Sequence, residues 1–427
     1  MAPVVRPISH DYNVHIIRKE IVVPALPILE HVIPLTNLDL TIPPVSVHVF
    51  FCYKNTSNRN FACALSHLKT SLSRALVGYF IYAGRLVANG VGLPEILCNS
   101  KGVQFTQDYA PTRLAQLNMY NPDETVEGKL VPLLANHSQG CGSPVTEFSC
   151  GAMIVGCTFD HRVADAFSAN MFLTSWAKLS SKVSSESPNQ SFIRSTLSPR
   201  YLPKYCPEVQ NMYVKQPLRE TSHEALQPHL ASRIYYLHAK SIIDLQNFAN
   251  KNGKNYTKLE AFSAYLWKLL MHSQEVKDTK HSRIGIVVDG RPRLKTIGMS
   301  ANHFGNVLLL PFVESNAGDL KNNSISWGAA LIHDTIHRAA NEEHFQSLID
   351  FVETTKPTFL LAKIYCKADD AQSTGPSVLV SSGLRFPLYE VDYGWGKPTF
   401  ASYHFPWGGE AGYVMPSHSP VGDGSWV

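Results

Sequence analysis

The sequence predicts a mixed α/β protein built of two similar-sized domains. Its 427 residues are enough for two globular domains that each bury a sizeable core. Strand-like and helix-like segments alternate in both halves, and a Ser- and Pro-rich stretch over residues 180–208 separates the halves. We therefore expect an N-terminal domain over residues 1–182, a crossover loop over 183–214 and a C-terminal domain over 215–427.

The first half of the chain predicts strands on either side of a long helix, with a second helix after them. Residues 43–54 alternate and are rich in Val and Phe, which is typical of a strand. Residues 62–80 carry Leu and Ala at helical spacing. Residues 143–159 predict two short strands around a Cys-Gly bend. The helix that should follow Asp165 has one apolar stripe, made of Ala169, Phe172, Trp176 and Leu179.

The second half repeats the mixture of strands and helices. Residues 232–239 predict a strand, and residues 256–272 predict an amphipathic helix. Residues 283–294 predict a buried strand that ends in a glycine-containing turn. Residues 377–396 predict a strand followed by an aromatic, glycine-rich loop.

Composition and charge exclude several classes of protein. The net charge of +4 is spread along the chain without a basic block, which argues against a nucleic-acid binder. No segment approaches about 20 consecutive apolar residues, so no transmembrane helix is expected. The N-terminus lacks the apolar region of a secretory signal, and the eight cysteines are too scattered for a disulfide scaffold. These features predict a cytoplasmic protein. Without a C-x-x-C or H-E-x-x-H spacing, no metal site is expected.

One histidine is placed for acid–base chemistry. His161 follows the apolar run at residues 153–159, so a rigid strand should deliver it to an edge where active-site residues are common. Imidazole has a reference pKa of about 6.5, which suits a general base acting on a hydroxyl or an amine. Asp165 could orient this imidazole or cap the helix that begins at Ala166, and the local sequence favours the cap. Taken alone, the pair fits a structural histidine better than a catalytic one.

A second motif changes this interpretation. HRVAD at residues 161–165 and DYGWG at residues 392–396 together resemble the HxxxD and DFGWG motifs of the plant BAHD acyltransferases. Further segments match the same family in the same order, namely TNLDL (36–40), LVGYFIYAGRL (76–86), KLEAFSAYLWK (258–268) and HFGN (303–306). Within the family, the likeness is greatest to the branch of coniferyl alcohol acyltransferases, near which coumarin synthases lie.

The resemblance implies a fold and a reaction. The fold would be two chloramphenicol acetyltransferase-like α/β domains with a channel between them. The reaction would be direct acyl transfer from CoA to a small aromatic alcohol, with His161 as general base and no acyl-enzyme. Acyl-CoA would be a co-substrate, with no bound cofactor, and the protein would be a monomer. Two alternatives stay open: a coumarin synthase that lactonises an ortho-hydroxycinnamoyl-CoA, and a non-catalytic ligand-binding relative.

The resemblance also assigns supporting residues. Asp165 would be structural and would pair with Arg291. Loop-shaping roles would fall to Asp392, Gly394, Trp395 and Gly396. Thr257 and Lys258 match positions near the phosphoadenosine of CoA, at the start of a helix where Thr257 and Glu260 have the spacing of a capping box. A solvated surface lysine is an equal alternative for Lys258.

Two departures from the family pattern bear on the substrate and the fold. Gly383 stands where relatives that use shikimate-like acceptors have Trp, which predicts a wider pocket and argues against such acceptors. Ser381 nearby could donate a hydrogen bond to the carbonyl oxygen, although an ordinary strand serine is the simpler interpretation. The sequence stops at residue 427, where the family has a further strand and helix, so we expect these to be missing and a sheet edge to be exposed.

Overall fold

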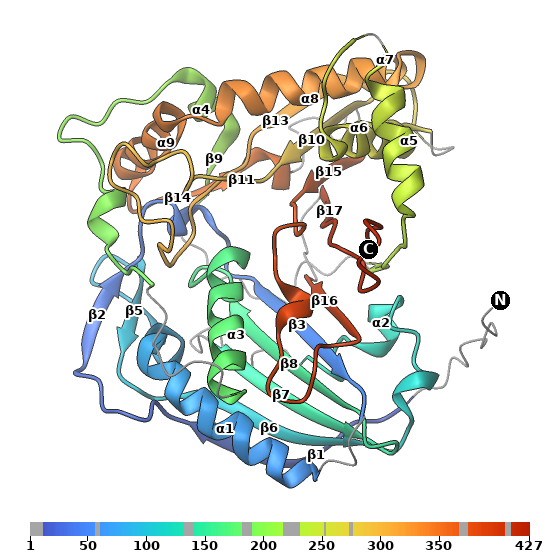
Figure 1. Cartoon of the computed structure of the whole chain (residues 1–427). Helices are drawn as coiled ribbons and strands as arrows, with labels where there is room; N and C mark the ends of the chain where they lie inside the picture. The colour runs from blue at the N-terminus through green and yellow to red at the C-terminus, as the bar shows by residue number, and fades with distance from the viewer. Residues whose placement is uncertain are drawn as a thin grey trace.

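The computed structural model describes residues 12–55, 60–131, 141–181, 190–216, 231–251, 253–272, 276–366, 375–405 and 411–427. Two separate sheets, each with its own helices, form the two halves of the molecule (Figure 1). They have the mixed α/β character that the sequence predicts. No helix in these ranges is long and apolar enough to cross a membrane.

The N-terminal half is built on a six-stranded sheet with the order β1-β6-β7-β8-β3-β16. Its strands are β1 (His15–Val22), β3 (Ser46–Tyr53), β6 (Val103–Ala110), β7 (Cys141–Phe148), β8 (Met153–Asp160) and β16 (Phe400–His404). Only β6 and β7 pair in parallel, and the other neighbours are antiparallel. The last strand comes from the far end of the chain, so the C-terminal half completes this sheet. The predicted domain boundaries remain predictions.

Two helices cover one face of this sheet, α1 (Phe61–Gly78) and α3 (Ala166–Ser180) (Figure 1). The predicted apolar stripe of α3 is confirmed, because its four residues are all buried. Trp176 of α3 joins the two helices. Its ring is fully buried, and its indole N–H donates to the carbonyl of Leu68 in α1 at 3.1 Å. The predicted strand pair at residues 143–159 is also confirmed, with a turn at 149–152.

The C-terminal half contains a four-stranded sheet with the order β13-β10-β15-β17. Its strands are β10 (His281–Ile286), β13 (Phe312–Asn316), β15 (Ser377–Val380) and β17 (Ala411–Val414). The helices of this half include α5 (Ala239–Ala249), α6 (Lys258–Met271) and α8 (Ile325–Ala339). A separate core forms here around Trp267, whose indole N–H donates to the hydroxyl of Ser282 at 2.8 Å.

Further elements lie outside the two main sheets. The additional strands are β2 (His31–Pro34), β4 (Arg85–Ala88), β5 (Pro94–Cys98), β9 (Tyr213–Gln216), β11 (Val288–Asp289), β12 (Leu308–Leu309) and β14 (Phe359–Ala362). The additional helices are α2 (Pro122–Thr125), α4 (Pro207–Met212), α7 (Ala317–Asn322) and α9 (Glu342–Thr355). Strands β11 and β12 pair with each other beside the cavity described below.

The predicted strand at residues 232–239 is wrong. This segment makes a single bridge, between Leu237 and Trp426, before α5 begins. Tyr235 is exposed, so the alternation of apolar residues does not mark a buried face here. The strand expected over residues 283–294 is shorter than predicted, because β10 ends at Ile286 and a separate short strand, β11, follows.

Candidate active site

A cavity of about 400 Å³ lies where the two halves meet. The start of α3 and the end of β8 form one side of it, and β11, β12 and the β15 and β17 region form the other. Most of its walls are apolar or aromatic, and the titratable side chains that line it are His161, Asp165, Asp289, Arg291, Arg293, Tyr365, Arg385 and Tyr413. Because His161 is among them, the histidine predicted from the sequence does face a cavity.

His161 is the first residue after β8, and the turn that holds it is anchored on both sides. Its backbone N–H donates to the carbonyl of Val45 at 2.9 Å. On the next residue, the Arg162 side chain is held by the buried carboxylate of Asp160 at 2.7 Å. The His161 ring is half-buried and meets the ring of Phe405 edge-on, with 5.9 Å between centroids. The imidazole is therefore fixed at the strand end without being buried.

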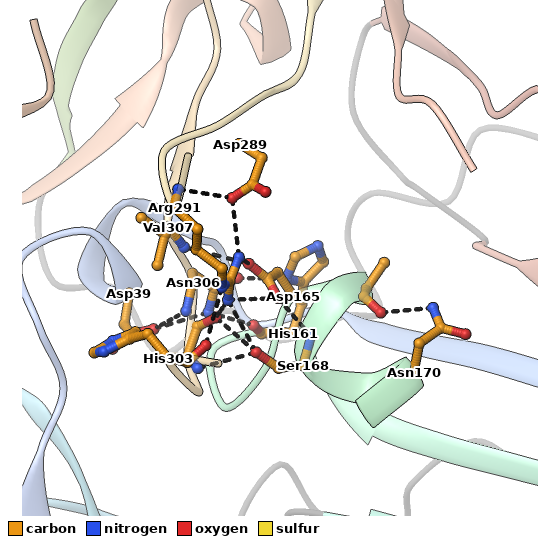
Figure 2. A network of polar contacts seen from close by, with 12 residues as sticks. Asp39, His161, Asp165, Ser168, Asn170, Asp289, Arg291, His303, Asn306 and Val307 are labelled. Carbon is orange, nitrogen blue, oxygen red and sulfur yellow. Dashed lines mark hydrogen bonds and ion pairs between the residues drawn. The ribbon is translucent and has the colours of Figure 1, made fainter. Parts of the chain in front are cut away.

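Asn306 decides which nitrogen of His161 carries the proton (Figure 2). The Asn306 amide nitrogen lies 2.9 Å from a carboxylate oxygen of Asp39 and 2.9 Å from the His161 carbonyl, so it must be the donor end of the amide. The amide oxygen then faces Nδ1 of His161 at 3.1 Å and accepts its proton. The neutral ring is protonated on Nδ1, and Nε2 keeps its lone pair. Nε2 makes no hydrogen bond within the part of the chain that the structure describes.

Asp39 is the anchor behind Asn306. It is fully buried, and its carboxylate also receives a second bond from the Asn306 backbone N–H at 2.7 Å. Its other oxygen is bound by the Thr36 hydroxyl at 2.7 Å and by the Arg194 guanidinium at 2.9 Å. The arginine and four N–H and O–H groups, two each from Thr36 and Asn306, offset the cost of burying this charge. Asp39 lies in TNLDL and Asn306 in HFGN. Both motifs support the family resemblance, but the sequence analysis did not identify either residue as part of the site.

Asp165 caps α3 and does not contact the imidazole. One carboxylate oxygen accepts the Ser168 N–H at 2.9 Å, which is the cap that the local sequence favours. Both oxygens also receive the Arg291 guanidinium, at 2.8 and 3.1 Å. Burial alone would raise the pKa of Asp165, but the charge of Arg291 and these hydrogen bonds outweigh it and lower the pKa. The structure thus places Asp165 and Arg291 in the pair expected from the resemblance.

Arg291 connects this pair to the segment that carries Asn306. Its guanidinium also donates to the carbonyls of His303 and Gly305, at 2.9 and 2.8 Å. The face of the guanidinium lies 4.4 Å from the ring centre of Phe167, which lines the cavity. One buried arginine therefore sets the position of the α3 N-terminus, of the HFGN segment and of one cavity wall (Figure 2).

The DYGWG motif lies away from the cavity, behind α3. The Asp392 carboxylate closes the loop by accepting the backbone N–H groups of Gly394, Trp395 and Gly396, at 2.8, 2.9 and 2.9 Å. The two glycines have φ angles of 103° and 99°, which side chains disfavour. The buried ring of Tyr393 packs edge-on against Trp176 of α3, with 4.9 Å between centroids. This loop supports the helix that carries Asp165 at its start.

The predicted CoA residues lie at the start of α6. Thr257 and Glu260 form the capping box, and Lys258 is exposed. Leu259, the next residue, lines the cavity of His161. Ser381 and Tyr413 both line the same cavity, and burial raises the pKa of the Tyr413 phenol to about 12.

Gly383 does not enlarge this cavity, contrary to the prediction. A Cβ atom at this position would lie 2.5 Å from the hydroxyl oxygen of Ser417 and 3.1 Å from the carbonyl of Pro416. The Gly383 N–H also donates to that carbonyl at 2.8 Å. The missing side chain would point toward residues 415–417, and Gly383 is not among the residues that line the cavity. A glycine is required at position 383 because the backbone there passes close to residues 415–417.

Comparisons with known proteins find similar sequences along nearly the whole chain. A family model described as "Transferase family" matches residues 12–427. Rosmarinate synthase of Plectranthus scutellarioides is 30% identical over 413 residues, which cover 92% of this chain and 90% of that protein. Shikimate O-hydroxycinnamoyltransferase of Nicotiana tabacum is 26% identical over 414 residues, 91% of this chain and 89% of that protein.

Solved structures show the same fold. Vinorine synthase superposes with a TM-score of 0.70 at 19% identity, covering 97% of this chain and 94% of that chain. TRI101 of F. sporotrichioides, solved in complex with coenzyme A and T-2, superposes with a TM-score of 0.72 at 16% identity and covers 93% of each chain.

Proposed function

The chain belongs to the plant BAHD acyltransferases, a family of acyl-CoA-dependent enzymes, and we propose that it transfers an acyl group from CoA to the hydroxyl of a phenylpropanoid alcohol such as coniferyl alcohol. Acyl-CoA is the co-substrate and His161 is the general base. The observation that carries the proposal is the fixed tautomer of His161, whose free Nε2 belongs to a side chain that lines the cavity. A monomeric state and a cytoplasmic location stay predictions.

The reaction proceeds in two proton transfers through His161. Nε2 takes the proton of the acceptor hydroxyl while its oxygen attacks the thioester carbonyl, and a C–O bond forms. The resulting tetrahedral oxyanion collapses and breaks the C–S bond. The imidazolium returns the proton to the departing thiolate, which gives the ester and free CoA. His161 returns to its starting protonation state. Throughout the reaction Nδ1 keeps its proton, which stays hydrogen-bonded to the amide oxygen of Asn306.

A second cavity supports the intermolecular form of the reaction. It has a volume of about 270 Å³, runs along α3 and shares Phe167, Arg385 and Phe386 with the cavity of His161. An acceptor can approach along this side while the acyl donor occupies the side toward Leu259. Aromatic walls at Phe167, Phe386 and Phe405 suit an aromatic acceptor. Similar proteins include enzymes named as hydroxycinnamoyl transferases, which agrees with phenylpropanoid chemistry.

The other proposed roles follow from position. Ser381 lines the cavity and can donate its hydroxyl proton to the carbonyl oxygen. Thr257 and Lys258 lie at the end of the cavity marked by Leu259, where the nucleotide part of CoA would emerge. Asp392 and its loop act on catalysis only through the position of α3.

The test is a paired assay with mass-spectrometric product detection. One reaction contains acetyl-CoA and coniferyl alcohol, and the other contains only an ortho-hydroxylated feruloyl-CoA. Ester in the first reaction, lost in His161→Ala by about 100- to 10,000-fold, is the expected result. A coumarin formed only in the second, faster than spontaneously and lost in the same variant, would replace the proposal by intramolecular lactonisation. Full activity of His161→Ala would refute the general-base mechanism for both.

A further inference from the structure

The stretch of chain between the two halves lies directly against the HFGN segment. Ser191 and His303 form a parallel β-bridge, and the N–H of Phe304 donates to the Ser191 carbonyl at 2.8 Å. The ring of Phe192 packs against the ring of Phe304, with 5.2 Å between centroids. These contacts fix the connecting stretch to the segment whose amide faces the general base.

Arg194 extends this contact to the carboxylate behind the base. It begins a short 3-10 helix, Arg194–Leu197. Its Nη1 donates to Oδ2 of Asp39 at 2.9 Å, and the exposed fractions of the two side chains are 11% and 0%. A Cβ atom at Gly305 would overlap the same Nη1, and the φ angle of Gly305 is 139°. The glycine therefore leaves room for the guanidinium between the HFGN backbone and Asp39.

A chain of polar contacts leads from Arg194 to the imidazole (Figure 2). While Oδ2 of Asp39 faces Arg194, its Oδ1 accepts an amide N–H of Asn306 at 2.9 Å. The amide oxygen of Asn306 in turn accepts Nδ1–H of His161 at 3.1 Å. The amide has this orientation because Oδ1 of Asp39 is an acceptor. Arg194 is the one cationic side chain in contact with Asp39 among the residues that the structure describes.

The contact with Asp39 is the main interaction of this guanidinium. The Nε and Nη2 atoms of Arg194 are buried and have no hydrogen-bond partner within the described ranges of the chain. Arg200, on the same stretch, uses all three of its nitrogens, because it binds Asp350, Glu343 and the carbonyl of Lys204. Buried donors without a partner cost free energy, so stability alone does not account for the position of Arg194.

We propose that Arg194 is a positioning residue for His161. It acts through Asp39 and Asn306, and it makes the stretch between the two halves part of the support of the active site. The proposal rests on the proposed function, since the tautomer of His161 matters only where this residue is the base. The charge of Arg194 keeps Asp39 ionised as an acceptor, and Asp39 then keeps the amide nitrogen of Asn306 turned toward itself.

The consequence of losing Arg194 follows from burial. Without the guanidinium, the carboxylate of Asp39 would be a buried charge with no cation in contact, which favours uptake of a proton or displacement. Either change weakens the hold of Asp39 on the amide of Asn306. The amide could then turn and present its N–H group to Nδ1 of His161. A ring that accepts at Nδ1 carries its proton on Nε2, where it cannot act as the base.

The experiment compares three variants of the full chain, Arg194→Gln, Arg194→Lys and the control Arg200→Gln. Arg200 suits the control because it also pairs with a buried carboxylate, Asp350 on α9, at 2.5 Å. Within the described ranges, no hydrogen bond joins that pair to the contacts that lead to His161. Each variant is measured by steady-state kinetics of ester formation, by ¹⁵N chemical shifts of the His161 ring and by thermal melts.

We expect Arg194→Gln to lower kcat by about tenfold, which is the effect of losing roughly one hydrogen bond, with KM values within twofold of wild type. Its ¹⁵N spectrum should show neutral rings protonated on Nε2 beside those protonated on Nδ1. Arg194→Lys should recover most of kcat and the wild-type spectrum, because the contact with Asp39 uses a single nitrogen and lysine keeps the charge. Arg200→Gln should lower the melting temperature and leave both kcat and the tautomer unchanged.

Each outcome decides the inference. A folded Arg194→Gln protein with a wild-type ¹⁵N spectrum overturns it, whatever its kcat, and so does an equal change of tautomer in Arg200→Gln. Should Arg194→Gln not fold, the double variant Asp39→Asn/Arg194→Gln leaves no unpaired buried charge and replaces it. There too, a ring protonated only on Nδ1 overturns the role of Arg194. A wild-type protein that forms no ester would refute the proposed function, whereas the ¹⁵N comparison needs no substrate and still tests Arg194.

Discussion

In the Asn306→Ala variant, the proton of the neutral His161 ring should no longer be held on Nδ1. The substitution removes the acceptor 3.1 Å from Nδ1 and also the donor that joins Asp39 to the His161 carbonyl. The ring is then free to rotate and to carry its proton on Nε2, where it cannot act as a base. At any moment a fraction of the molecules would have His161 rotated or protonated on Nε2. We therefore expect kcat to fall while the affinity for acyl-CoA stays the same.

The size of the effect follows from the bonds that are lost. A neutral hydrogen bond contributes about 0.5–1.5 kcal/mol net, so losing the bond to Nδ1 should cost roughly tenfold in the population of the correct state. Misplacement of the ring lowers kcat further. The fall cannot exceed the loss expected on complete removal of the base, which is about 100- to 10,000-fold. We expect kcat to fall by about 10- to 100-fold. The unfolding free energy should fall by about 1–3 kcal/mol, because buried acceptors around Asn306 lose their donor.

The assay is steady-state kinetics on the ester-forming reaction, with ¹⁵N chemical shifts of the His161 ring as a direct reading of its tautomer. Asn306→Asp is the matched comparison: it restores an acceptor for Nδ1 but puts a second carboxylate next to Asp39, so it should destabilise the fold far more than it changes the tautomer. A well-folded Asn306→Ala protein with kcat within twofold of wild type, and with Nδ1 still protonated, would refute the reasoning.

Two further predictions concern stability. Asp165→Asn removes the buried counter-charge of Arg291, which keeps its ion pair with the partly exposed Asp289, and should lower the unfolding free energy by about 3 kcal/mol in urea titrations; a change below about 1 kcal/mol would contradict the role of this pair. Burial lowers the pKa of three histidines, to about 3 for His48 and to about 4 for His303 and His404. Below the unfolded value of about 6.5 these groups gain protons on unfolding, so stability is lost as pH falls toward 4. Burial raises the pKa of Asp108 to about 6, so this carboxyl releases about one proton on unfolding near pH 5. Together these four groups then take up about two protons and contribute a slope of about 3 kcal/mol per pH unit. A stability that is flat between pH 6 and pH 4.5 would contradict this prediction.

Several elements of this protein could be predicted from the sequence because the interactions that form them span only a few residues. Asp165 caps α3 through the N–H of a residue three positions later, and Thr257 and Glu260 close a capping box over the same distance. The apolar stripe of α3 follows from helical periodicity alone. His161 could be singled out because an apolar strand and a helix cap stand on either side of it.

The tertiary structure decided everything that depends on which distant segments meet. Asn306 reaches His161 across 145 residues of chain, and no local pattern near either residue shows that they share a hydrogen bond. A side chain at Gly383 would meet Ser417, and only the folded chain shows that residues 415–417 pass this close to it. Residues 232–239 alternate like a strand but find one bridging partner, since a strand exists only where a second segment offers its backbone. The sequence by itself therefore determined the family, the candidate base and the local caps. Long-range packing decided how the base is oriented and which walls enclose it.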